Sequence, residues 1–163
     1  MKNLFNCILV LFLVSSLSSC GYQLRGSVDM LGLDNIRIIS NSRSNISKIL
    51  EQKFSSNIQS EDDNIPNYPA IKIISIDRES RQLSVNSFGR VDEYEISKTL
   101  SYEFIFSDEK NFSGTIRASA SYDFNESQMQ GTKEREKIAD DNIDRTLVRK
   151  LIYKFRSTLK SNS

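Results

Sequence analysis

The sequence predicts an α/β protein of the α+β sandwich type, with two helices packed on one face of a four-stranded, mostly antiparallel sheet. Three observations support this fold class. Two segments alternate between apolar and polar residues, two others are rich in β-branched residues, and two repeat apolar residues every three or four positions. Alternation with period two is typical of strands with one buried face, and the longer spacing is typical of amphipathic helices. The opposite face of the sheet is therefore expected to be polar.

The clearest strand signal covers residues 94–106. Apolar side chains occupy six of its seven even positions, the exception being Lys98, and the odd positions from 93 to 103 are all polar. The segment 115–124 repeats this pattern, so the two segments predict an antiparallel hairpin. Shorter strands are predicted at 36–39 and 70–76. Apolar residues occupy both even and odd positions of 70–76, which predicts a strand covered on both faces of the sheet. The polar segment Asp77–Gly89 is expected to form a strand end and a mobile loop.

Two helices complete the predicted sandwich. The first is expected from Ser44 to Ile58, because polar side chains that can cap a helix precede four apolar residues on one helical face: Ile46, Ile49, Leu50 and Phe54. The second is expected from Thr132, as its cap, to Lys160. Its acidic side chains gather in the first half and its basic side chains in the second, which suits the helix dipole.

The N-terminus has the features of a bacterial lipoprotein signal peptide. Lys2 precedes an apolar run over residues 4–14, which is too short to cross a bilayer. Leu17-Ser18-Ser19-Cys20 then resembles a lipobox, in which the cysteine is acylated and becomes the first residue of the mature protein. The alternative is a buried N-terminal helix. We expect a signal peptide at 1–19, a lipidated segment at 20–35 and a single α/β domain at 36–163.

Lipidation of Cys20 would fix the protein's location. An N-palmitoyl group and an S-diacylglycerol on this residue would exceed the two signals needed for stable membrane anchoring. In lipoprotein families an Asp after the cysteine favours retention in the inner membrane, so Gly21 favours the outer membrane. We expect a lipid-anchored protein on the periplasmic side of the outer membrane.

Composition excludes several classes of function. The chain has no histidine, and Cys20 is its only cysteine outside the signal peptide. A nucleophile paired with histidine is therefore impossible, and an internal disulfide, a zinc site or another metal site is not expected. Loss of Lys2 with the signal peptide lowers the 22 basic residues to 21, equal to the 21 acidic residues. Zero net charge argues against nucleic-acid binding. We expect no enzyme activity and no cofactor other than the lipids on Cys20.

Three stretches of the chain have features of one known family: Cys20–Gly26 directly behind the lipobox, Gly89–Ile96 at the start of the long strand, and Tyr122–Asn125 before the last helix. Together they resemble the LptE family of outer-membrane lipopolysaccharide-assembly lipoproteins. The first places a glycine, an aromatic residue, a polar residue, leucine and arginine after the lipidated cysteine, as family members do. The order and spacing of the stretches extend the resemblance over nearly the whole chain.

The resemblance implies a non-catalytic role with two partners. Family members plug the β-barrel protein LptD, assist its assembly, and help to insert lipopolysaccharide into the outer leaflet. They are also reported to bind lipopolysaccharide directly. Family positions implicated in that binding match Arg90 and Lys133 in this sequence. Both would lie at the open end of the predicted hairpin, where they could be neighbours. The alternative is that they are ordinary solvated charges. Arg117 and Lys98 are weaker candidates, and Lys98 is expected at the strand's exposed edge.

Two other functions remain open from the sequence. One is a different outer-membrane lipoprotein that acts as an activator or pilot of another envelope machine. The other is an envelope hydrolase that uses Glu93 and Glu95, which face the same way on one strand at a spacing that suits a glycosidase pair. Their position on a regular, solvent-facing strand without aromatic residues for a sugar argues against the hydrolase.

Overall fold

The computed structural model of the protein describes residues 36–54, 58–59, 69–106 and 110–162. The predicted signal peptide at 1–19, Cys20 and the predicted lipidated segment 20–35 lie outside these residues. The elements of the described part, in chain order, are β1 (Arg37–Ser40), α2 (Asn45–Phe54), β2 (Ile58–Gln59), β3 (Ala70–Val85), β4 (Val91–Phe106), β5 (Lys110–Asp123), the 3-10 helix η2 (Glu126–Gln128) and α3 (Met129–Asn162).

The strands form one mixed sheet in the order β2-β1-β3-β4-β5. The four predicted strands are all present, and the two-residue β2 adds an edge strand that was not predicted. β1 runs parallel to β2 and β3, whereas β3, β4 and β5 are antiparallel. The predicted hairpin of β4 and β5 is confirmed.

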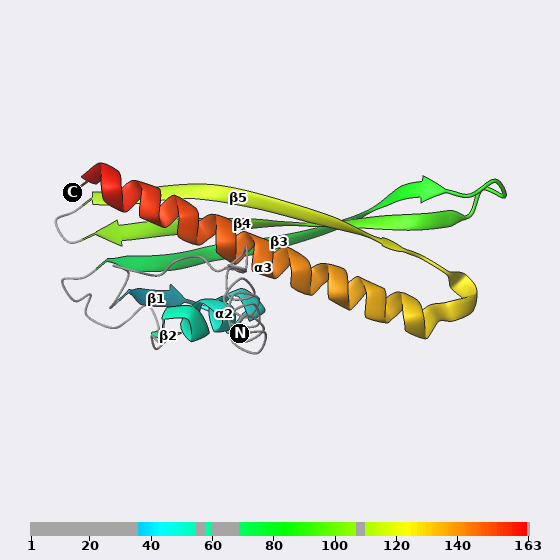
Figure 1. The fold of residues 1–163 in the computed structure, drawn as a ribbon, viewed down its shortest axis with the longest axis horizontal. Coiled ribbons are helices and arrows are strands. Elements are labelled where there is room, and N and C mark those ends of the chain that lie inside the picture. The colour runs from blue at the N-terminus through cyan, green and yellow to red at the C-terminus, as the bar shows by residue number, and fades with distance from the viewer. Residues whose placement is uncertain (1–35, 55–57, 60–68, 107–109, 163) are drawn as a thin grey trace, which may run out of the picture.

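Both helices cover the same face of the sheet, as predicted (Figure 1). α3 lies along β5 and β4, and α2 packs beside β1 and against α3. The 34 residues of α3 span about 50 Å at 1.5 Å each, which matches the length of about 53 Å expected for the 16 residues of β4. The hairpin of β3 and β4 extends beyond the start of α3 (Figure 1).

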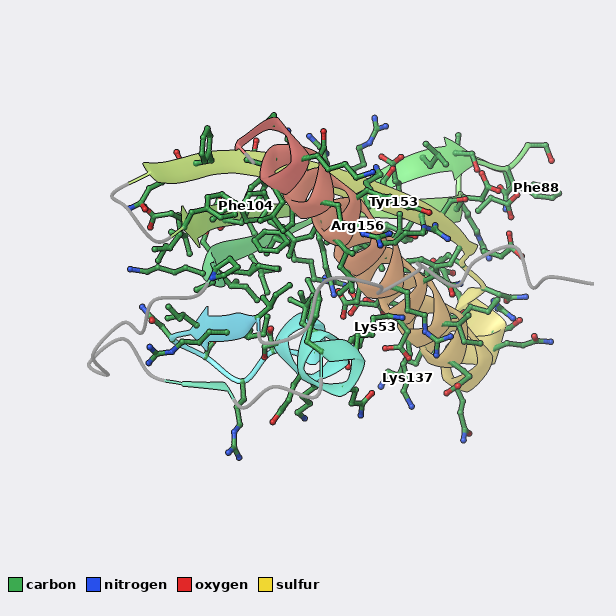
Figure 2. All side chains as sticks on the ribbon, turned by 60° about the vertical axis from the view of Figure 1, so that its left-hand side comes forward. Lys53, Phe88, Phe104, Lys137, Tyr153 and Arg156 are labelled. Atoms are coloured by element: carbon green, nitrogen blue, oxygen red, sulfur yellow. The ribbon has the colours of Figure 1, made fainter. Side chains whose placement is uncertain are left out.

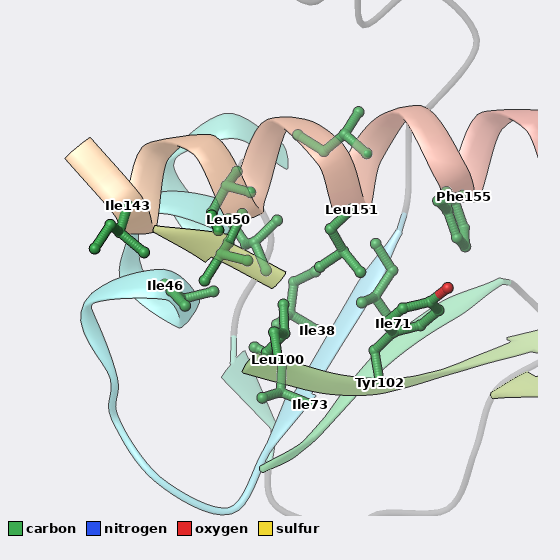
Figure 3. Close-up of a cluster of buried hydrophobic side chains, with 14 of the residues drawn as sticks. Ile38, Ile46, Leu50, Ile71, Ile73, Leu100, Tyr102, Ile143, Leu151 and Phe155 are labelled. Carbon is green, nitrogen blue, oxygen red and sulfur yellow. The ribbon is translucent and has the colours of Figure 1, made fainter. Parts of the chain in front are cut away.

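The core lies where α2, α3 and the sheet meet. Figure 3 shows Ile46 and Leu50 of α2 facing the same space as Leu151 of α3, above side chains from β1, β3 and β4. The even residues of β4 point into this core, and Phe104 packs edge-on against Phe155 with ring centroids 5.0 Å apart. Each apolar side chain of this size contributes about 1.5–3 kcal/mol on burial, so the core fixes α3 on the sheet.

A bulge in β3 explains its mixed apolar pattern. Ile73 pairs with Tyr102 and Ser75 pairs with Ser101, so Ile74 is an extra residue without a partner in the register. The inserted residue shifts the parity of the inward-facing side chains: Ile71 and Ile73 are buried, but Ile74 is 52% exposed. The prediction that both sides of this strand are covered holds at its start, where Ala70 and Ile71 are both buried, and is wrong at Ile74.

β3 also continues far beyond its predicted end. Residues 77–85 pair with β4, and only a short turn at 86–90 joins the two strands. The Asn86 amide donates to the Arg90 carbonyl at 2.8 Å, and Gly89 adopts the positive φ of 74° that favours glycine. The mobile loop predicted for Asp77–Gly89 is instead a long strand and an ordered turn.

The helix boundaries differ from the prediction in two places. The Ser44 hydroxyl accepts a hydrogen bond from the Ser47 amide, which confirms a capping oxygen there, but α2 ends at Phe54 and Ile58 belongs to β2. α3 begins at Met129, ahead of Thr132. The cap of the preceding η2 is Asn125, whose side chain accepts from the Ser127 amide. Thr132 is a buried residue in the first turns of α3, and its hydroxyl donates a hydrogen bond to the Asn125 carbonyl.

Candidate functional site

The residues predicted to bind lipopolysaccharide lie at the end of the molecule where the β3–β4 turn, η2 and the start of α3 meet. The turn is held by one side chain, because the Asn86 Oδ1 accepts hydrogen bonds from the amides of Phe88 and Arg90 at 3.0 and 3.1 Å. This fixes the backbone that carries Arg90. Phe88 stands at the tip, 86% exposed (Figure 2).

Arg90 is an exposed cation with one weak partner. Its Nη1 lies 3.9 Å from the Glu126 Oε2 of η2, and the two side chains are 72% and 66% exposed. Solvent screening makes such a pair worth little. The Arg90 guanidinium can therefore exchange this carboxylate for the phosphate of a ligand, which guanidinium groups bind in a bidentate manner.

Lys133 is exposed on the first turns of α3, in a shallow pocket of about 280 Å³ with Arg78, Glu136, Lys137 and Asp140. Arg78 already holds Glu136 at 2.7 Å and Asp140 at 3.2 Å. Burial acts to lower the pKa of Arg78, but the hydrogen bonds to these two carboxylates raise it overall. Within the described part of the chain, neither Lys133 nor Lys137 pairs with a carboxylate.

The structure thus groups Lys133 with Arg78 and Lys137, two residues that the sequence reasoning missed. Lys137 could have been found, because positions 133 and 137 share a helix face. Arg78 could not, because no apolar pattern extends β3 to that position. Arg90 lies at the same end but on a different element, beside Glu126.

Lys98 lies on the buried side of the sheet, so the prediction that it occupies an exposed edge was wrong. Its ammonium donates to Asp140 at 2.6 Å and to Asp144 at 2.7 Å, and only 9% of the side chain is exposed. Asn45 of α2 also donates to Asp144, at 2.9 Å. A cation held by two carboxylates from α3 serves the packing of α3 on β4. The adjoining cavity of about 400 Å³, which Lys98 and Arg78 help to line, therefore offers no unpaired ammonium.

Arg117 belongs to the opposite face of the sheet, which no helix of the described part covers. It donates to the Ser97 hydroxyl at 2.8 Å and to Glu79 at 3.2 Å. The neighbouring Arg81 and Glu95 form a second ion pair across this face at 2.6 Å. Short hydroxyl side chains fill much of the remainder: Ser75, Ser97, Thr99, Ser101, Ser113, Thr115, Ser119 and Ser121. We call this the polar sheet face.

The two carboxylates considered for a hydrolase do not have the properties of an acid-base pair. The hydrogen bond from Arg81 lowers the pKa of Glu95, which keeps this carboxyl ionised and unable to act as a general acid at neutral pH. Glu93 accepts a hydrogen bond from the Ser84 hydroxyl at 3.2 Å. Their arrangement is that of a hydrogen-bonded strand surface.

The described residues contain neither a cluster of metal ligands nor a helix that could span a membrane. No group of three or more His, Cys, Asp or Glu side chains there is placed to hold a metal ion. No helix there combines the length and apolar character that a membrane span requires.

These features define a class of protein: an α+β domain with one helix-covered sheet face, one polar sheet face, and exposed cations beside carboxylates at the end where β3 turns into β4. The chain matches the LptE family, described as lipopolysaccharide-assembly, over residues 33–155. It therefore belongs to the LptE lipopolysaccharide-assembly family. Membership gives it a role in lipopolysaccharide assembly as a lipoprotein of the cell envelope.

Solved structures share the fold. Rare lipoprotein B from Shewanella oneidensis matches with a TM-score of 0.66 and 12% identity over 77% of this chain and 96% of that chain. An uncharacterized lipoprotein B from Nitrosomonas europaea matches with a TM-score of 0.61 and 21% identity, over 80% and 87%. A minor lipoprotein from Acinetobacter baumannii matches with a TM-score of 0.58 and 9% identity, over 76% and 90%. A comparison with curated protein sequences found no match.

Proposed function

We propose that this protein is a lipid-anchored outer-membrane lipoprotein that plugs the β-barrel LptD, helps it to assemble, and aids insertion of lipopolysaccharide into the outer leaflet. The observation that carries the proposal is the polar sheet face in a chain that belongs to the lipopolysaccharide-assembly family. The lumen of a transmembrane barrel is polar, so a plug needs an outer surface that can form hydrogen bonds with it.

The charge arrangement of the polar sheet face supports this role. Its arginines are paired with carboxylates in the sheet, Arg81 with Glu95 and Arg117 with Glu79. The hydroxyl side chains between them can each donate and accept hydrogen bonds. A surface with paired arginines and many hydroxyls can pack against a polar wall without leaving those guanidinium groups buried and unpaired. We propose that the protein has no catalytic activity.

Direct binding of lipopolysaccharide is the second part of the proposal. Lipid A carries phosphates, and the cations available to them are Arg90, whose single carboxylate partner is weak, and Lys133 with Lys137 on the same helix face. Charge-assisted hydrogen bonds from these groups would hold the phosphates. Cys20, with its N-palmitoyl and S-diacylglycerol groups, would keep the domain at the periplasmic side of the outer membrane.

Co-purification from detergent-solubilised outer membrane tests the partner. We expect the native protein to be recovered in near-stoichiometric amounts with LptD, identified by mass spectrometry. Recovery of the protein alone, or with a peptidoglycan synthase or a secretin, would favour the pilot or activator function and contradict the proposal.

Charge reversal tests the ligand. Arg90→Asp combined with Lys133→Asp should weaken lipopolysaccharide binding while LptD is still recovered. The matched control is Lys53→Asp with Lys160→Asp, which makes the same change in net charge at exposed lysines on α2 and the last turn of α3. Equal lipopolysaccharide binding by the two double variants would show that Arg90 and Lys133 are ordinary solvated charges.

The anchor has its own test. Cys20→Ala should abolish incorporation of labelled palmitate and release the protein from the membrane fraction. Labelling that survives the substitution would show that the lipid is attached elsewhere.

A further inference from the structure

The second half of α3 carries a surface with only one sign of charge. Residues 145–162 contain no acidic residue, and all the acidic residues of the helix precede them. The exposed basic residues around Tyr153 are Arg145, Arg149, Lys150 and Lys154. Tyr153 itself is 56% exposed. We call these side chains, with Tyr153, the basic helix face.

The basic helix face forms one continuous surface. Steps of four residues place Arg145, Arg149 and Tyr153 on one side of the helix. Lys150 and Lys154 form the adjacent row, one position further along the chain. The opposite side of this part of α3 packs into the core, so the face points away from the sheet. Figure 2 labels Tyr153 on this part of the helix.

The charges of the basic helix face are not compensated. Among the described residues, no carboxylate forms an ion pair with any of its cations. Lys150 donates to the Arg117 carbonyl at 2.8 Å, a neutral partner that leaves its charge in place. The polar sheet face differs, because Arg81 and Arg117 are each paired with a carboxylate there. A face of unpaired cations attracts an anionic partner.

This face lies at the end of the domain where the chain enters the fold. Phe155 of α3 stacks on Phe106, the last residue of β4, with ring centroids 5.6 Å apart. β1 begins at the same end, because Arg37 pairs with Ala70 and Ala70 pairs with Ile105. Figure 1 shows the last turns of α3 and the start of β1 together at this end. The predicted lipidated segment therefore joins the domain beside the basic helix face.

The proposed role in barrel assembly includes a stage at which this face is uncovered. A domain that helps its barrel to assemble must be present before the barrel encloses it. At that stage lipidated Cys20 would tether the domain to the periplasmic leaflet. Residues 20–35 can reach no further than about 55 Å, so phospholipid headgroups stay at a high effective concentration around the domain.

We propose that, before a barrel encloses the domain, the basic helix face binds anionic phospholipid headgroups of the periplasmic leaflet, an inference that rests on the lipid anchor of the proposed function. Clusters of Lys and Arg beside a membrane anchor are drawn to the negative potential of anionic lipids. Tyr153 suits the same interface, because a tyrosine ring has an apolar body and a polar tip. The contact holds the entry end of the domain against the membrane.

A single tryptophan reports this contact. The chain contains no tryptophan, so Tyr153→Trp introduces the only indole, and Phe88→Trp, at the opposite end and 86% exposed, is the matched control. Each lipidated full-length protein is reconstituted into vesicles of phosphatidylethanolamine with either phosphatidylglycerol or phosphatidylcholine. We expect the Tyr153→Trp emission to shift to shorter wavelength, and to be quenched by brominated acyl chains, only with phosphatidylglycerol. Phe88→Trp should behave alike in both vesicles.

Charge reversal tests the electrostatic origin of the contact. Arg149→Glu with Lys154→Glu, in the Tyr153→Trp protein, should lower the ratio of lipid-bound to free indole by at least about 25-fold, since each cation near an anionic surface contributes about fivefold. The matched control is Lys48→Glu with Lys53→Glu, at exposed lysines of α2, which should leave the ratio near its original value. Salt at 1 M should also abolish the shift, because it shortens the Debye length to about 3 Å.

The outcomes separate this inference from the function on which it rests. A protein that a high-salt wash removes from both kinds of vesicle would contradict the lipid anchor and with it the proposed function. A retained protein whose indole at position 153 behaves alike in both vesicles, or whose two double variants behave alike, would overturn the headgroup contact alone. An indole that ignores the lipids and shifts only with the purified barrel partner would assign the face to the barrel and also overturn the inference.

Discussion

Lys98 shows how a single side chain can look functional in a sequence and prove structural. It interrupts the apolar positions of β4, and an alternating pattern places it on the buried side. The chain accommodates it with two carboxylates from α3, four residues apart, so that one turn of the helix faces the ammonium. A charge in the core is tolerated only when it is paired in this way.

Removal of this ammonium should be costly. Lys98→Met leaves the Asp144 carboxylate, whose side chain is 3% exposed, without its cation. We expect a loss of about 3–5 kcal/mol in the free energy of unfolding, the cost of breaking a buried pair from one side. Addition of Asp144→Leu should recover much of the loss. Urea unfolding measures both variants, and a double variant no more stable than the single one would contradict this account.

Glu95 gives the polar sheet face a dependence on pH. Its pKa is lowered below 4.5, chiefly by the hydrogen bond from Arg81. A carboxyl with a depressed folded-state pKa stabilises the fold above its unfolded pKa, and this contribution is lost as the pH falls through the folded value. Thermal unfolding between pH 6 and pH 2 should therefore show a shallower acid decline for Glu95→Gln than for the wild type. Superimposable pH profiles would contradict the assignment.

At the scale of elements, the sequence predicted the strands whose side chains face the core and missed the part of β3 that is exposed to solvent. β4 and β5 could be predicted because their even residues lie under α3. The outer half of β3 could not, because Arg78, Ser80 and Gln82 are exposed and leave no apolar pattern. The bulge at Ile74 was hidden as well, since an apolar residue in a bulge resembles one in a buried strand.

The site was predictable to a similar extent. Arg90 and Lys133 followed from the family resemblance, and Lys137 follows from helix spacing. The pairing of Arg78 with α3 joins residues 62 positions apart, and the register of β3 that creates it depends on the bulge. Local sequence carries no signal for such a contact.

Gly114 of β5 is an element-scale feature with a clear test. It pairs with Tyr102, and a Cβ at this position would lie 2.7 Å from the tyrosine hydroxyl oxygen. Because Tyr102 is only 2% exposed, its ring has little room to move. Gly114→Ala should therefore destabilise the fold by about 1–3 kcal/mol, the usual cost of overpacking. The matched control is Ser113→Ala. Equal urea-unfolding midpoints for Gly114→Ala and Ser113→Ala would contradict the close approach of the ring.

For the whole molecule, the structure separates three surfaces. α2 and α3 cover one face of the sheet, the polar sheet face lies opposite, and the exposed cations Arg90, Lys133 and Lys137 lie beside carboxylates at the end where β3 turns into β4. Figure 2 shows Phe88 at that end and Lys137 on the neighbouring part of α3. In a plug, this arrangement would leave a ligand-binding end free while the polar sheet face meets the barrel wall.

Enclosure of the domain within the barrel is the central claim, and thiol protection measures it most directly. In the proposed mature protein Cys7 has left with the signal peptide and Cys20 carries lipid, so Ser113→Cys would place a lone free thiol on an exposed position of the polar sheet face. In the native complex we expect a bulky maleimide to label this thiol slowly, and to label it rapidly once denaturant separates the partners. Equally rapid labelling in the intact complex would contradict the plug.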